Sequence, residues 1–201
     1  HVPDVSIIPH RTPRIQGPRE GRLFSERRKI FSFPLEFWPH LCYNQQAHQN
    51  KCTVSEERGW TMILISCIDD RGGLLFHGRR LSRDRVLCQD VLRTCAGSPL
   101  WMAPGSRSLF SSLRDGLSSS ILTSEDFLAQ AAPGEFCFLE DRPIRPFLDR
   151  VESMVLYHWN RRYPADLFLD LDPAALGWSL LGREEFPGSS HKKITKEVYR
   201  P

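Results

Sequence analysis

The chain of 201 residues has no long apolar run and no large excess of one charge. No apolar segment reaches the roughly 20 residues that a membrane-spanning helix needs, so no membrane association is expected. The formal net charge is only +3, and because nucleic-acid binding normally shows as a marked basic excess, no nucleic-acid partner is expected from composition. The first residues also lack the regions of a secretory signal. We therefore expect a cytoplasmic protein.

The cysteines form no C-x-x-C pair. There are six, at Cys42, Cys52, Cys67, Cys88, Cys95 and Cys137. Without paired spacing, neither a zinc ribbon nor a thioredoxin-like redox motif is indicated. Reduced, partly buried thiols are the simpler interpretation, and no metal cofactor is expected.

Residues 1–61 differ in character from the rest of the chain. They carry prolines at positions 3, 9, 13 and 18, a charge-rich and mostly basic run over 19–29, and little helical or strand periodicity. Such composition is typical of a disordered tail or linker. We expect a disordered extension at 1–61 and a single α/β domain at 62–201.

A sharper hypothesis for this extension comes from the genetic code. Residues 56–59, Glu-Glu-Arg-Gly, can be encoded by an unbroken purine run, and Met62 follows shortly after. A bacterial ribosome-binding site ahead of a start codon looks like this when it is translated in frame, so residues 1–61 would be a mistranslated leader and Met62 the true start. The alternatives are a genuine disordered or targeting extension, or a metal clip whose spacing fits no standard zinc module, formed by His40, Cys42, His48 and Cys52.

From residue 62 onward, strand and helix patterns alternate. Residues 62–68 are a continuous apolar run, typical of a central strand buried on both faces. Helical spacing then begins after Ser82, the expected N-cap. Later elements are expected as strands at 100–102 and 135–139, helices at 106–113 and 124–128, a loop at 116–120 and a helical turn at 147–152. With hairpin-like strands at the end, this order predicts an α/β fold: a mixed, mainly parallel sheet with flanking helices and a C-terminal antiparallel hairpin.

The C-terminal run carries an ordered set of motifs. An acidic residue precedes an apolar strand, an Ala-Asp turn follows, a Trp-x-Leu-Leu strand ends in Glu-x-Phe, and a last strand closes near Tyr and Arg. The residues are Asp149, 154–157, 165–168, 178–181, 184–186 and 197–200. This order resembles the closing strands of the dihydrofolate reductases, and the resemblance implies their fold over residues 62–201.

The N-terminal half of this domain resembles the same family. An apolar strand, then Asp69, then a glycine-containing loop, leads to Leu81-x-x-Asp84 at the start of a helix. The resemblance implies that Asp84 is the catalytic carboxylate, which in the family pairs with the N–H groups of a pterin while a nicotinamide supplies hydride. An aspartate at a helix start also has a structural explanation, because it complements the helix dipole.

The chain departs from the family where the nucleotide cofactor would bind. The Pro-Trp before the helix is Gly78-Arg79, and the phosphate-binding Gly-Arg-x-Thr becomes residues 103–106, which leaves Ser106 at the threonine position as a ligand-binding candidate. The Gly-Gly that admits a pyrophosphate becomes Glu140-Asp141, whose carboxylates would repel it. The segment 110–136 is also short for an adenosine-binding strand and helix. NADP is therefore expected only in an altered mode.

Arginines surround Asp84 where the loop meets the helix. They are Arg79, Arg80, Arg83 and Arg85, and guanidinium groups beside a helix N-terminus favour phosphate or carboxylate. This pattern predicts a small anionic or heterocyclic ligand. A solvated basic patch paired with nearby aspartates is the alternative.

Two short patterns give a second resemblance. The Arg-Arg-x-Ser-Arg-Asp-Arg run at 79–85 and the Gly-Ser-Ser-His at 188–191 resemble short bacterial proteins labelled ribonuclease Z. Genuine ribonuclease Z is a zinc enzyme that needs a His-x-His-x-Asp-His cluster, and this chain has none. Ser190 and His191 are interpreted as part of a polar hairpin loop, since no nucleophile elbow accompanies them.

Three functions follow, in order. The first is a divergent dihydrofolate reductase-like protein, an NAD(P)H-dependent reductase of a pterin-like or other heterocyclic substrate with a degraded cofactor site. The second is a non-catalytic anion- or nucleotide-binding or interaction protein that kept the fold. The third is a ribonuclease without the zinc motif. The oligomeric state is left open.

Overall fold

The computed structural model describes residues 62–111, 113 and 120–201. The leader hypothesis for 1–61 and the metal clip proposed within it lie outside the described residues, as does most of the loop expected at 116–120. In the described part of the chain, no helix has the length and apolarity needed to cross a membrane.

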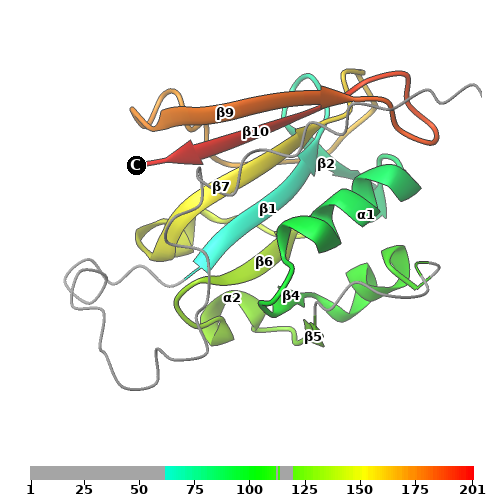
Figure 1. Ribbon diagram of the computed structural model, residues 1–201. Helices are drawn as coiled ribbons and strands as arrows, with labels where there is room; N and C mark the ends of the chain where they lie inside the picture. The colour runs from blue at the N-terminus through cyan, green and yellow to red at the C-terminus, as the bar shows by residue number, and fades with distance from the viewer. Residues whose placement is uncertain (1–61, 112, 114–119) are drawn as a thin grey trace, which may run out of the picture. The chain divides into compact units, whose positions relative to one another are not determined.

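A seven-stranded sheet forms the centre of the described region (Figure 1). Its strands, in spatial order, are β5 (Ile121–Thr123), β4 (Leu100–Met102), β6 (Glu135–Leu139), β1 (Met62–Ile68), β7 (Val151–His158), β10 (Ile194–Arg200) and β9 (Ser179–Phe186). The first five strands are parallel to one another. β10 runs antiparallel to β7, and β9 antiparallel to β10. The predicted mixed, mainly parallel sheet with a C-terminal antiparallel hairpin is confirmed.

The apolar run of β1 explains its central place. All seven of its residues are buried, because helices and loops cover both faces of a strand that lies between two parallel neighbours. Ile63 and Ile65 pack in one core cluster with the buried side of α1 (Arg85–Thr94). Met62 and Leu64 pack on the opposite face with Phe127 of α2 (Phe127–Gln130). The period-two alternation of a strand therefore divides β1 between two cores.

Several expected boundaries were wrong. The N-cap of α1 is Asp84 and not Ser82, because the Asp84 carboxylate accepts the N–H groups of Val86 and Leu87. The helix expected at 106–113 is a 3-10 helix at Pro104–Leu109. The helical turn expected at 147–152 is a 3-10 helix at Arg145–Arg150, and Glu152 already lies in β7. Prolines at the first turn of both 3-10 segments fit these earlier starts.

A small second sheet was not predicted. It consists of β3 (Arg79–Arg80), β2 (Gly73–Phe76) and β8 (Leu167–Phe168), in that order. β2 and β3 form a hairpin whose turn holds His77 and Gly78 at positive φ. The hairpin therefore extends the segment after β1 and fixes where Arg79 and Arg80 leave the backbone.

Core packing on the α1 side can be tested at Ile65, which is fully buried. Ile65→Ala should lower the free energy of unfolding by about 2–5 kcal/mol, because it removes buried methyl groups and leaves a cavity. Urea denaturation gives this value. Leu180→Ala is the control, since Leu180 is 50% exposed, and it should change stability by less than about 0.5 kcal/mol. Equal losses at the two positions would contradict this packing.

Candidate functional site

The candidate site lies at the carboxyl ends of the parallel strands. The segments that follow β1, β6, β7 and β9 reach this edge, and the N-terminus of α1 meets them there (Figure 1). Open α/β sheets commonly bind ligands at this edge, because the loops there come together from several strands. It is also where the sequence placed Asp84 and its neighbouring arginines.

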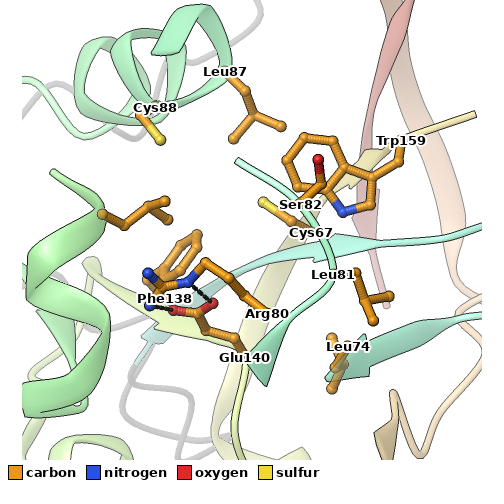
Figure 2. Close-up of a pocket in the computed structure, with 11 residues that line it drawn as sticks. Cys67, Leu74, Arg80, Leu81, Ser82, Leu87, Cys88, Phe138, Glu140 and Trp159 are labelled. Carbon is orange, nitrogen blue, oxygen red and sulfur yellow. Dashed lines mark hydrogen bonds and ion pairs between the residues drawn. The ribbon is translucent and has the colours of Figure 1, made fainter. Parts of the chain in front are cut away.

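A cavity of about 10 Å³ lies between α1 and the sheet at this edge. Figure 2 shows Leu87 and Cys88 reaching toward it from α1, and Trp159 bordering it on another side. A space of this size holds about one water molecule. A pterin or nicotinamide ring does not fit in the cavity as it stands.

An ion pair occupies the space beside this cavity. Arg80 Nε lies 3.0 Å from Glu140 Oε1, and Arg80 Nη2 lies 3.1 Å from Glu140 Oε2. Both side chains are largely buried, at 18% and 9% exposed. Arg80 Nη2 also donates to the backbone oxygen of Gly105. This forked pair fixes both partners and joins β3 to the end of β6.

The Asp84 carboxylate is fully used by the chain itself. Oδ1 accepts the N–H groups of Val86 and Leu87 in α1 and, at 2.9 Å, that of Ser189. Oδ2 accepts the Ser190 N–H at 2.7 Å and lies 3.0 Å from the Ser190 hydroxyl. The side chain has no exposed surface. Neither oxygen is free to pair with a ligand in this arrangement.

The same contacts set the acidity of Asp84. Burial alone would raise the pKa of this carboxyl, but the N–H groups of Ser189, Ser190 and Leu87, together with the Ser190 hydroxyl, hold the pKa well below its ordinary value. The carboxylate therefore stays charged across the physiological range. Its charge complements the N-terminus of α1 and ties the loop between β9 and β10 to that helix.

Gly188 lets the β9–β10 loop approach Asp84. A Cβ atom at this position would lie 2.3 Å from Asp84 Oδ2 and 2.7 Å from a methyl carbon of Ile194. No side chain fits there unless the loop or the carboxylate moves. The Gly-Ser-Ser sequence at 188–190 thus supplies both the space and the donors that Asp84 needs.

His191 continues this network into the interior. Its Nε2 lies 2.9 Å from the Tyr163 hydroxyl and 3.3 Å from the Ser82 hydroxyl. The ring stacks on Trp159, with centroids 4.7 Å apart. The loop between β9 and β10 is therefore held to the segment after β7 as well as to α1.

This cluster is not a catalytic triad. In a triad, the nucleophile and the orienting carboxylate contact different nitrogens of the histidine ring. Here the Ser190 hydroxyl and Asp84 Oδ2 both approach Nδ1, at 3.0 Å and 3.4 Å, while Nε2 faces Tyr163. The polar-loop interpretation of Ser190 and His191 accords with these contacts.

The predicted anion site is only partly assembled. Arg79, Arg83 and Arg85 are exposed at the edge around Asp84. Arg80 is committed to Glu140. The N–H groups at the start of α1 are not open to an anion, because Asp84 accepts those of Val86 and Leu87 and the Ser189 hydroxyl accepts that of Arg85.

Ser106 lies apart from these arginines. It is a buried residue of the 3-10 helix that follows β4. The described residues also contain no group of three or more His, Cys, Asp or Glu side chains placed to hold a metal ion.

The residues at this edge do not fit a dinucleotide cofactor. Glu140 stands where a pyrophosphate would approach the backbone, and its carboxylate is fixed there by Arg80. The next carboxylate, Asp141, pairs with Arg142. The backbone oxygen of Gly105 already accepts from Arg80. Two fixed carboxylates disfavour a pyrophosphate, and the nearest guanidinium is not available to it.

Sequence reasoning missed the contacts that close the site. Arg161 and Arg162 follow β7 directly, and Lys192 lies in the β9–β10 loop. The signal was present, because each of these segments follows a strand that ends at the same edge of the sheet. The partnership between Asp84 and residues 188–190 spans more than 100 positions and had no local signal.

Comparisons with known proteins give one structural likeness. No protein-family model matches the chain, and no curated protein matches it. Among solved structures, it is similar to dihydrofolate reductase from Enterococcus faecalis in complex with NADP(H) and RAB-propyl, with a TM-score of 0.46 and 9% sequence identity, over 71% of this chain and 96% of that one. This likeness agrees with the fold resemblance found in the sequence and concerns the fold alone.

The contribution of Asp84 to stability should depend on pH. Its pKa is lower in the folded chain than its ordinary value, so its contribution is present above that value and is lost as the pH falls below it. Asp84→Asn places an amide N–H₂ against backbone donors and should cost about 1–3 kcal/mol near pH 7. The loss of stability on acidification should also be smaller than in the wild type.

Chemical denaturation between neutral and acid pH measures both effects. Asp70→Asn is the matched control, because Asp70 is exposed at the same edge, and its stability at neutral pH should stay within about 0.5 kcal/mol of wild type. An Asp84→Asn variant as stable as the control would mean that the carboxylate does not anchor the loop.

The close approach at Gly188 gives a separate test. Gly188→Ala should destabilise the fold by about 1–3 kcal/mol, since the new methyl group would overlap Asp84 and Ile194. Gly105→Ala introduces the same methyl group where nothing lies within 4 Å and should be nearly neutral. Thermal unfolding of the two variants compares them. Similar melting temperatures would show that the loop does not pack against Asp84.

Proposed function

We propose that this chain is a non-catalytic protein with a dihydrofolate reductase-like fold that acts by binding an anionic partner. The observation that carries the proposal is the saturation of Asp84. A carboxylate that pairs with a heterocycle needs a free oxygen facing a pocket, whereas both oxygens of Asp84 accept hydrogen bonds from the chain itself. The one ionised group expected to do chemistry therefore acts as a structural anchor.

The closed pocket supports the same proposal. A reductase must hold its substrate ring and a nicotinamide in contact, and such sites usually measure hundreds of Å³. Here the cavity near Asp84 is about 10 Å³, and the ion pair of Arg80 with Glu140 borders it. Reduction of a pterin-like substrate with NAD(P)H would require this pair to separate and the β9–β10 loop to leave Asp84.

Cations at the same edge supply the binding surface. Six exposed side chains there form no ion pair with another described residue, and we call them the basic edge: Arg79, Arg83, Arg85, Arg161, Arg162 and Lys192. Exposed, unpaired guanidinium groups recognise phosphate and carboxylate groups with little cost of desolvation. The four described free cysteines are buried thiols, which supports the expected cytoplasmic location as part of this proposal.

Ligand tests on the full 201-residue chain separate binding from catalysis. Dihydrofolate with NADPH should give no oxidation of NADPH above background, and methotrexate should not raise the melting temperature. Pyrophosphate at low ionic strength should raise it, and Arg79→Ala/Arg83→Ala should remove most of that shift without unfolding the fold, because both side chains are exposed. Turnover of dihydrofolate, or stabilisation by methotrexate, would reject the proposal.

A further inference from the structure

We infer that the anionic partner is a single-stranded nucleic acid bound along the basic edge. The inference rests on the proposed function, because it names the class of anion that the same surface takes. It depends on three features of the described residues: cations brought together from separate segments, the burial or pairing of most nearby carboxylates, and an exposed aromatic pair beside the cations.

Hydrogen bonds hold the segments of the basic edge together. The Ser190 hydroxyl donates to the Arg83 backbone oxygen, and the Arg85 N–H donates to the Ser189 hydroxyl. His191 contacts the Tyr163 hydroxyl, which brings the segment that carries Arg161 and Arg162 to the same loop. The Asp70 N–H donates to the Arg161 backbone oxygen. The cations therefore sit on a connected framework and not on independent loops.

The acidic groups near this edge are largely neutralised. Asp84 is buried under backbone donors, Glu140 is paired with Arg80, and Asp69 is buried and paired with Arg71. Asp70 remains exposed. The net charge of +3 led to no expectation of a nucleic-acid partner, but net charge does not report where charges lie. At this edge the folded chain presents six unpaired cations against one exposed carboxylate that directly follows β1.

Five of the six cations are arginines, and aromatic rings lie next to one of them. Arg79 is the cross-strand partner of Phe76, which is 40% exposed. The Phe76 ring meets the exposed ring of His77 edge to face, with centroids 4.1 Å apart. Cations that contact the backbone, combined with aromatic rings on which bases stack, are the features by which proteins hold single strands.

The shape of the surface favours an extended strand over a small ligand or a membrane. The cavity at this edge is too small for a nucleotide base, so an anion must lie across the surface. Exposed leucines that could enter a lipid layer, Leu180 and Leu181, belong to the start of β9, at the opposite edge of the sheet. Arginine also suits phosphate better than lysine does, because its fork contacts two oxygens at once.

Salt dependence of binding is the direct test. Fluorescence anisotropy would follow a labelled single strand of about 15 uridines, within the usual range of site sizes, binding to the full chain. If about six phosphates are contacted, the slope of log affinity against log salt should be near −4. Arg83→Ala/Arg161→Ala should reduce the slope by about 1.4 and weaken binding by at least about tenfold at low salt.

A matched variant controls for charge. Arg93 and Arg145 are exposed at the opposite end of the sheet, so Arg93→Ala/Arg145→Ala removes the same charge and should leave slope and affinity nearly unchanged. Phe76→Ala should weaken binding about tenfold without changing the slope, because stacking does not release counterions. Equal loss in the two arginine variants, or no effect of the edge variant, would overturn the inference.

Other anions distinguish this inference from the proposed function. If the single strand does not bind, while pyrophosphate, an acidic peptide or vesicles containing phosphatidylserine do, the partner is not a nucleic acid and the anion-binding proposal stands. If methotrexate and dihydrofolate bind with turnover, the proposed function fails, whatever the result with the single strand. Tighter binding of duplex than of single-stranded RNA would also contradict the inference, since paired bases cannot stack on Phe76.

Discussion

The arrangement of this edge depends on one buried carboxylate. Asp84 receives N–H groups from the first turn of α1 and from the β9–β10 loop, two segments that are about as far apart as the domain allows. A buried charge is tolerated only when its lone pairs are satisfied, and here the chain satisfies them without a ligand. The cap of the helix, the position of the loop and the closure of the pocket therefore follow from the same contact.

The Arg80–Glu140 pair makes the same change on the other side of the cavity. Where a ligand-binding protein would leave a cation open, this chain pairs it with a buried carboxylate from the end of a neighbouring strand. Separating either partner would leave an uncompensated buried charge, which is costly. The fold thus keeps the general position of a ligand site while its polar groups are used internally, and the exposed cations around it are the groups that remain free to bind.

The sequence predicted the sheet because its signals are local. The apolar run at Met62–Ile68 and the alternation of strands and helices identified the central strand and the mixed sheet. It did not predict which residue caps α1, since Ser82 and Asp84 are both good caps and only the distant donors of Ser189 and Ser190 decide between them. The Arg80–Glu140 pair and the gathering of Arg161, Arg162 and Lys192 beside Arg83 likewise depend on strand order, which no local pattern contains.

Amide hydrogen exchange at Ser189 and Ser190 tests most directly whether the chain itself occupies Asp84. Both N–H groups donate to this carboxylate, although both residues lie in an exposed loop. If the site is closed as described, these amides should exchange as slowly as those of β10, because they open only when the loop leaves the helix. Exchange as fast as that of the exposed hairpin residue Gly78 would show that Asp84 is free for a ligand and would contradict the account.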